Sequence, residues 1–197
     1  MHKSVGGVIR SFIAIELDHA VLRAIDRVQS ELRSEAPQGA VRWVNTSGIH
    51  LTLKFLGDVP VGQLKDVETG ILRACTGCVP FRMLCHGVGC FPNPARPRVV
   101  WMGVEEPTGM LAAVQKALER EIAPLGYPSE DRPFSPHLTL GRVRPGVSQG
   151  DLKLLGDLLV SYRKGKPVEM HVSAVSLIRS DLTSGGAIYT PLAHVSL

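Results

Sequence analysis

The amino-acid sequence predicts a fold of mixed strands and helices, arranged as two similar lobes related by a pseudo-twofold axis. The chain has 197 residues, 44% of them apolar, which suits one domain with a substantial core. The tetrapeptide HLTL begins at His50 and again at His137, and at this spacing of 87 residues the apolar patterns coincide over most of the chain. Two copies are too few for a solenoid, so we predict one domain, 1–197, of two duplicated lobes at approximately 12–91 and 99–178.

Each copy opens with an apolar run typical of a buried strand, FIAIEL from Phe12 and VVWMGV from Val99. A helix with one apolar stripe follows in both copies. Asp18 is placed to cap the first helix, and Pro124 is placed to end the second. The two stripes consist of Val21, Leu22, Ile25, Val28 and Leu32, and of Met110, Leu111, Val114, Leu118 and Ile122.

The HLTL strand comes second in each copy and leads into another helix, which starts near Pro60 or Ser148. A last strand closes each copy, from Pro80 in the first and from Pro167 in the second. Each copy therefore reads β-α-β-α-β, and a C-terminal strand at 186–192 completes a sheet. The second pair of helical stripes consists of Leu64, Val67 and Ile71, and of Leu152, Leu155 and Leu159.

Strand alternation separates the HLTL side chains into two sets. Successive side chains point to opposite faces, so the leucines share one face while histidine and threonine share the other. A pseudo-twofold axis would bring His50 and Thr52 opposite His137 and Thr139 across a central cleft. Leaving such polar groups buried without partners would cost about 1–3 kcal/mol each. These four residues are therefore the candidate site.

Two histidines and two threonines favour acid–base catalysis on a phosphoester. Histidine titrates near neutrality, so one imidazole can accept a proton while the other donates one. The threonine hydroxyls can donate hydrogen bonds to the nonbridging phosphate oxygens. Without a nearby carboxylate cluster, the pattern favours a site that needs no metal.

One HLTL strand alone would be weak support for a catalytic site, but two copies in otherwise diverged segments favour one. Lys54 and Arg142 are further candidates for substrate contacts. Lys54 shares the side of Thr52, whereas Arg142 lies on the leucine side unless a bulge near Gly141 turns it around. For both residues, a structural or solvated cation is an equal alternative.

Three aromatic residues near the motifs, Phe55, Phe91 and Trp101, offer surfaces on which a base could stack. The apolar runs around them favour packing in the core instead.

The charge balance and the apolar segments of the sequence indicate which ligands and which compartment to expect. Twenty-two Lys and Arg against 18 Asp and Glu give a net charge of +4, which mildly favours an anionic ligand. The sequence shows no membrane span and no signal peptide, so we expect a cytoplasmic protein. Cys75, Cys78, Cys85 and Cys90 are expected to be reduced thiols that pack as small hydrophobes rather than a zinc site.

Several segments around the motifs resemble the two-histidine (2H) phosphoesterases. Within that superfamily the chain is similar to the bacterial and archaeal RNA 2′,3′-cyclic phosphodiesterases, once called 2′-5′ RNA ligases. The resemblance covers nearly the whole chain and includes the paired His-x-Thr-x signature. It rests on RSFIAIEL, VRWVNTSGIHLTLKFLGDV, GVGCFPNPARPRVVWMGV, FSPHLTLGRV and SLIRSDLTSGGAIYTPL.

The resemblance implies an α+β fold in which two lobes with antiparallel sheets, flanked by helices, surround a groove. It implies that His50 is the proton donor to the departing 3′ oxygen and His137 the proton acceptor that activates water, leaving a 2′-phosphate. The partners implied are RNA ends or nucleotides with a 2′,3′-cyclic phosphate. We expect no cofactor, no metal, no membrane and no obligate protein partner, and a monomer.

Two other functions remain open from the sequence. The same motifs suit 2′-5′ ligation of RNA, or cleavage of a 2′-5′ linkage or of a nucleotide-sized cyclic phosphate. From a different class, the chain could be a noncatalytic RNA-end binding module whose histidines only hold phosphate.

Overall fold

The computed structural model describes residues 7–183 and 186–197, and their strands and helices alternate much as the repeat predicts. The predicted C-terminal strand at 186–192 is present and extends to Ser196. In chain order the elements are β1 (Val8–Glu16), α1 (His19–Glu35), β2 (Val41–Trp43), β3 (His50–Pro60), α2 (Leu64–Cys75), β4 (Phe81–Phe91), β5 (Val99–Glu105), α3 (Met110–Ile122), β6 (His137–Val143), α4 (Gln149–Ser161), β7 (Val168–Val172), β8 (Ala174–Thr183) and β9 (Gly186–Ser196).

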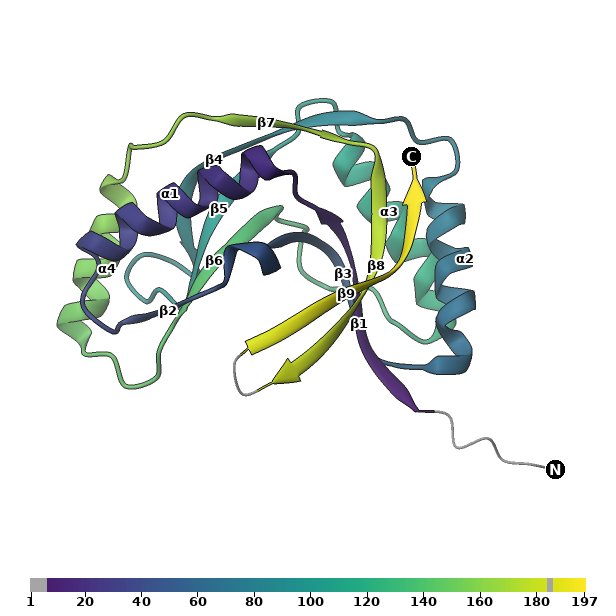
Figure 1. Ribbon diagram of the computed structural model, residues 1–197, viewed down its shortest axis with the longest axis horizontal. Coiled ribbons are helices and arrows are strands. Elements are labelled where there is room, and N and C mark those ends of the chain that lie inside the picture. The colour runs from purple at the N-terminus through teal and green to yellow at the C-terminus, as the bar shows by residue number, and fades with distance from the viewer. Residues whose placement is uncertain (1–6, 184–185) are drawn as a thin grey trace.

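All strands join one curved sheet in the order β7-β4-β5-β6-β3-β1-β8-β9, with β2 pairing to β6 (Figure 1). Every pairing between the described strands is antiparallel. The two HLTL strands, β3 and β6, meet in the middle of the sheet through one residue pair, Leu51 with Leu138. An antiparallel pair of equivalent residues is the arrangement that a twofold axis between them produces. The predicted α+β class with antiparallel strands is confirmed.

The two halves of the sheet are not the two segments of the sequence repeat. The last strand of the first copy, β4, pairs with β5 from the second copy, and β8 from the second copy pairs with β1 from the first. Strands consecutive in the chain usually pair, and β4 and β5 are joined by the short segment 92–98. The lobe boundaries 12–91 and 99–178 stay a prediction about the repeat. The single strand predicted from Pro167 is divided into β7, which pairs with β4, and β8, which pairs with β1.

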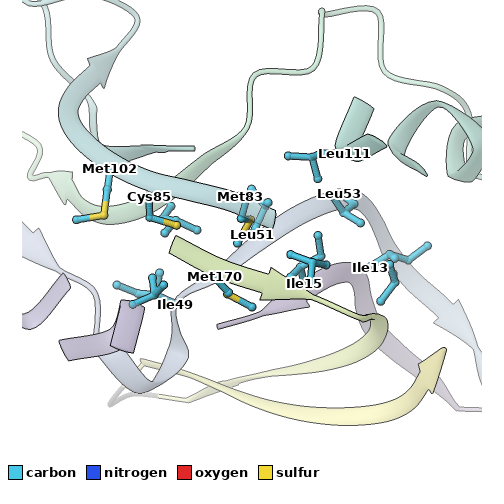
Figure 2. Packing of buried hydrophobic residues seen from close by; sticks show 14 of the residues in the cluster. Ile13, Ile15, Ile49, Leu51, Leu53, Met83, Cys85, Met102, Leu111 and Met170 are labelled. Carbon is cyan, nitrogen blue, oxygen red and sulfur yellow. The ribbon is translucent and has the colours of Figure 1, made fainter. Parts of the chain in front are cut away.

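The helices cover one face of the sheet. In Figure 1, α2 and α3 lie on one side of the molecule and α1 and α4 on the other. Residues of all four helices join Leu51 and Leu138 in one hydrophobic core, and Figure 2 shows Leu51 and Leu53 among side chains from neighbouring strands. On the opposite face, a small cluster of Phe12, Ala14 and Ile178 contains strand residues only. The leucines of HLTL thus anchor the strands to the core.

Helix starts follow the predicted caps. The Asp18 carboxylate accepts a hydrogen bond from the Val21 amide at 2.9 Å, and Ser148 Oγ accepts one from the Asp151 amide at 3.1 Å. Helix α2 begins later than predicted, because a 3₁₀ turn at Val61–Gln63 follows Pro60.

Three of the four cysteines, Cys75, Cys85 and Cys90, are buried in the hydrophobic core, as predicted for small apolar side chains. Burial raises the pKa of the Cys75 thiol to about 11 and that of Cys85 to about 12. Both groups are therefore neutral thiols at pH 7. No described helix is long and apolar enough to cross a membrane.

Candidate active site

The pairing of Leu51 with Leu138 brings the two motifs together on one face of the sheet, here called the histidine face. In an antiparallel pair, the residues that flank one partner lie opposite those that flank the other. His50 therefore lies beside Thr139, and His137 beside Thr52. The two histidines are diagonal neighbours, for which strand geometry gives a Cα–Cα separation of about 7–8 Å.

Each histidine is oriented by a backbone carbonyl two residues earlier. The Nδ1 atom of His50 lies 2.9 Å from the Gly48 carbonyl oxygen, and that of His137 lies 2.8 Å from the Ser135 carbonyl oxygen. A carbonyl can only accept, so Nδ1 carries the proton in both rings. Nε2 is then left to accept or donate a proton, which is the state that acid–base chemistry requires.

His50 lies in an aromatic pocket formed by β1 and β9. Its ring stacks on Phe12 at a centroid distance of 4.4 Å and meets the edge of Tyr189 at 4.9 Å. Burial lowers the pKa of His50 to about 4, against the raising effects of the Gly48 carbonyl and the Glu16 carboxylate. The free protein therefore holds His50 neutral at pH 7. The ring of His137 meets Phe91 edge to face at 4.9 Å.

A bulge in β3 turns Lys54 away from the histidine face. Lys54 pairs with Ile13 and Thr52 with Ala14, which leaves Leu53 as an extra residue and places Lys54 on the helix side. The Lys54 residue is only 1% exposed. Its ammonium group forms an ion pair with Glu119 and donates a hydrogen bond to the Pro128 carbonyl at 2.9 Å. The predicted substrate contact at Lys54 is wrong: this lysine is a structural cation.

The equivalent bulge in β6 has the opposite effect on Arg142. Val100 pairs with Gly141 and Trp101 with Thr139, so Leu140 is the extra residue. Arg142 therefore lies on the side of Thr139, as expected from the sequence if a bulge occurs near Gly141. The side chain is exposed, and its contact with a substrate stays a prediction.

The same geometry exposes Phe55, which is the repeat equivalent of Arg142. Phe55 pairs across the strands with Phe12 on the histidine face and is 60% exposed. The expectation that it packs in the core is wrong, because strict alternation cannot anticipate the bulge at Leu53. A signal was present in the repeat, since a position that holds arginine in one copy is a poor core position in the other.

Phe91 and Trp101 lie on the histidine face as well, instead of in the main core. They are half-buried, and their rings pack together at a centroid distance of 5.3 Å. The Trp101 ring lies over Gly89, where an added Cβ would come within 2.4 Å of it.

Sequence reasoning missed a polar cluster beside His50, formed by Glu16, Ser176 and His194. The repeat did not reveal it, because Glu16 corresponds to Gly103 in the second copy and His194 lies beyond both copies. The described residues contain no group of three His, Cys, Asp or Glu side chains that could hold a metal ion.

Comparisons with known proteins point to one family. The family model described as the 2′-5′ RNA ligase superfamily matches residues 17–183. An RNA 2′,3′-cyclic phosphodiesterase of Methanothermobacter thermautotrophicus is 38% identical over 185 residues, covering 93% of this chain and 96% of that protein. One from Aquifex aeolicus is 33% identical over 184 residues, covering 93% and 94%.

Solved structures agree with the sequence relatives. The crystal structure of TT0787 of Thermus thermophilus aligns with a TM-score of 0.76 and 29% identity, covering 96% of this chain and 98% of that one. The crystal structure of Escherichia coli LigT complexed with 3′-AMP aligns with a TM-score of 0.74 and 27% identity over the same shares.

Proposed function

Because this chain belongs to the 2′-5′ RNA ligase superfamily, we propose that it is an RNA 2′,3′-cyclic phosphodiesterase, which opens a terminal cyclic phosphate to a 2′-phosphate. The observation that carries the proposal is the Leu51–Leu138 pair, since it sets both His-x-Thr motifs on one face. The reaction needs a base and an acid on opposite sides of a phosphate, and two diagonal histidines supply that arrangement.

The reaction begins when Nε2 of His137 takes a proton from water. The water oxygen attacks phosphorus, and the bond from phosphorus to the 3′ oxygen breaks. Nε2–H of His50 gives its proton to that oxygen, so the 2′-phosphate stays on the ribose and a 3′ hydroxyl forms. The hydroxyls of Thr52 and Thr139 donate to the nonbridging oxygens as negative charge builds up on them.

The proton on His50 arrives with the substrate. Burial keeps the pKa of His50 at about 4 in the free protein, so at pH 7 the donor is mostly unprotonated before binding. A phosphodiester anion next to Nε2 favours the charged imidazolium. Binding of the cyclic phosphate and protonation of His50 are therefore coupled.

Arg142 and Phe55 fit two parts of an RNA end. The exposed guanidinium of Arg142 lies on the side of His137 and can pair with a phosphate of the RNA strand. The exposed ring of Phe55 lies on the side of His50 and offers a base a stacking surface. The net charge of +4 agrees with a polyanionic partner.

A second activity is supported by aromatic rings on both sides of the histidine pair. Phe12, Phe55 and Tyr189 lie near His50, and Phe91 and Trp101 lie near His137. A nucleoside can therefore be accommodated on either side of the phosphate, which suits cleavage or formation of a 2′-5′ linkage.

We also propose that the protein works as a cytoplasmic monomer, without a cofactor or an obligate protein partner.

The test is hydrolysis of an oligonucleotide that ends in a 2′,3′-cyclic phosphate, in the presence of EDTA. Phosphorus NMR should show a 2′-phosphate as the product. His50→Ala and His137→Ala should each lose about 10²-fold to 10⁴-fold in turnover while keeping the wild-type melting temperature.

Three results would contradict the proposal. They are a 3′-phosphate product, loss of wild-type turnover in EDTA, and retained turnover in either histidine variant. Saturable binding of the cyclic phosphate by the wild type without any product would identify a noncatalytic RNA-end binding module. Release of a second nucleoside from a 2′-5′ dinucleotide would establish the linkage-cleaving activity.

A further inference from the structure

The two histidines share their immediate geometry but differ in one cross-strand neighbour. Both donate Nδ1–H to a carbonyl two residues earlier, and both lie beside a threonine of the other motif. On its outer side, His50 pairs with Glu16 of β1, whereas His137 pairs with Gly103 of β5. Glu16 and Gly103 are equivalent positions in the repeat, so the carboxylate breaks the symmetry of the site.

The Glu16 carboxylate is held in place on the histidine face. Ser176, which is 2% exposed, donates its hydroxyl to Oε1 of Glu16 at 2.5 Å. Nδ1 of His194 lies 2.9 Å from Ser176 Oγ and 3.2 Å from Oε1 of Glu16. A serine hydroxyl that donates to the carboxylate can also accept from this imidazole, so both contacts restrict Glu16.

The fold leaves no room for a matching carboxylate beside His137. A Cβ atom added at Gly103 would lie 2.9 Å from the His86 carbonyl oxygen, which is closer than side-chain carbons approach a backbone. Because that oxygen belongs to the main chain of β4, the sheet would have to shift to accommodate a side chain. The asymmetry is therefore part of the sheet itself.

A fixed negative charge beside an imidazole favours its protonated form. The titratable and charged groups around His50 are its cross-strand partner Glu16 from β1, Tyr189 from β9 and His137 from β6. His194 from β9 contacts Glu16. Glu16 is the one carboxylate among these described neighbours. Burial has the larger effect and lowers the pKa of His50, while the Gly48 carbonyl and, more weakly, the Glu16 carboxylate raise it. Because His137 has a carbonyl contact like that of His50, Glu16 is the raising contribution that distinguishes the two histidines.

We propose that Glu16 is a positioning residue that gives His50 the role of proton donor, with Ser176 and His194 fixing its carboxylate. This inference rests on the proposed function. It supplies a physical reason, in the chain's own residues, why His50 can take up a proton when the phosphate binds, despite its burial.

The test compares the wild type with Glu16→Gln, which keeps the shape of the side chain and its acceptor oxygen for Ser176. NMR titration should show the pKa of His50 falling by about one unit on loss of the charge. Since only the protonated donor reacts, kcat/KM at pH 7 should fall by about the same factor, tenfold. Glu16→Asp should recover part of both losses, and Ser176→Ala should lower both in the same proportion.

A matched control is Glu169→Gln, which removes a surface carboxylate paired with Arg82 and should change neither quantity. An unchanged pKa of His50 in Glu16→Gln would overturn the proposal. So would a lowered pKa with unchanged kcat/KM, because His50 would then not be the donor. Absence of hydrolysis by the wild type would contradict the proposed function instead, and the comparison of His50 pKa values would still report the effect of Glu16.

Discussion

Leu51 and Leu138 pair across the junction of β3 and β6, and both side chains are fully buried on the helix side of the sheet. Each leucine is flanked by a histidine and a threonine that must point the other way. The core therefore fixes the register of the site, because slipping either strand by one residue would bury the polar pair and expose the leucines.

The threonine hydroxyls provide a first prediction. Thr52→Val or Thr139→Val removes one hydrogen-bond donor while keeping the shape of the side chain. Each hydrogen bond to a charged phosphate contributes about 1.5–3 kcal/mol, so kcat/KM should fall by about 10-fold to 150-fold. Steady-state kinetics on the cyclic-phosphate oligonucleotide measures this. Wild-type rates in both variants would show that the hydroxyls do not contact the phosphate.

Substitution of Lys54 should affect stability, whereas substitution of Arg142 should affect substrate binding. Lys54→Met leaves the Glu119 carboxylate without its buried partner, so the free energy of unfolding should fall by about 3–5 kcal/mol, with little change in kcat/KM of the folded protein. Arg142→Met should lower kcat/KM by about tenfold or more with stability within about 0.5 kcal/mol of wild type. Urea unfolding and kinetics on both variants check the pair, and the reverse pattern would place Lys54 at the substrate.

The exposed ring of Phe55 predicts a preference among substrates. Stacking of a base on an aromatic ring contributes about 1–3 kcal/mol, so Phe55→Ala should raise KM by about 5-fold to 150-fold, whereas Phe55→Trp should preserve it. A cyclic phosphate of ribose without a base serves as the control substrate, since it should be insensitive to either change. An equal loss on both substrates would mean that the ring supports the strand and not the base.

His50 should also make stability depend on pH. Its pKa is about 4 in the folded protein against an ordinary value of 6.5, so the unfolded chain binds more protons between these pH values. This part of the stability is complete above pH 6.5 and is lost as the pH falls through 4, by about 3 kcal/mol. The free energy of unfolding of the wild type minus that of His50→Gln, measured by urea unfolding, should fall by that amount on acidification. A constant difference would contradict the lowered pKa.

The repeat at a spacing of 87 residues was enough to predict most of the order of elements and the placement of each histidine with its own threonine on one face of a strand, because both follow from local periodicity. The bulges at Leu53 and Leu140 could not be predicted, since an extra residue in one strand is defined by its partner strand. The exchange of β4 and β8 between lobes and the contact of Glu16 with His50 depend on tertiary pairing in the same way.

The central claim is that His50 and His137 flank one phosphate, and titration of adenosine 2′-monophosphate into the ¹⁵N-labelled protein tests it most directly. The Nε2 signals of both histidines should shift along one binding curve with a single Kd, and His137→Ala should weaken the response of His50. A response from only one histidine, or two curves with different Kd values, would contradict the account.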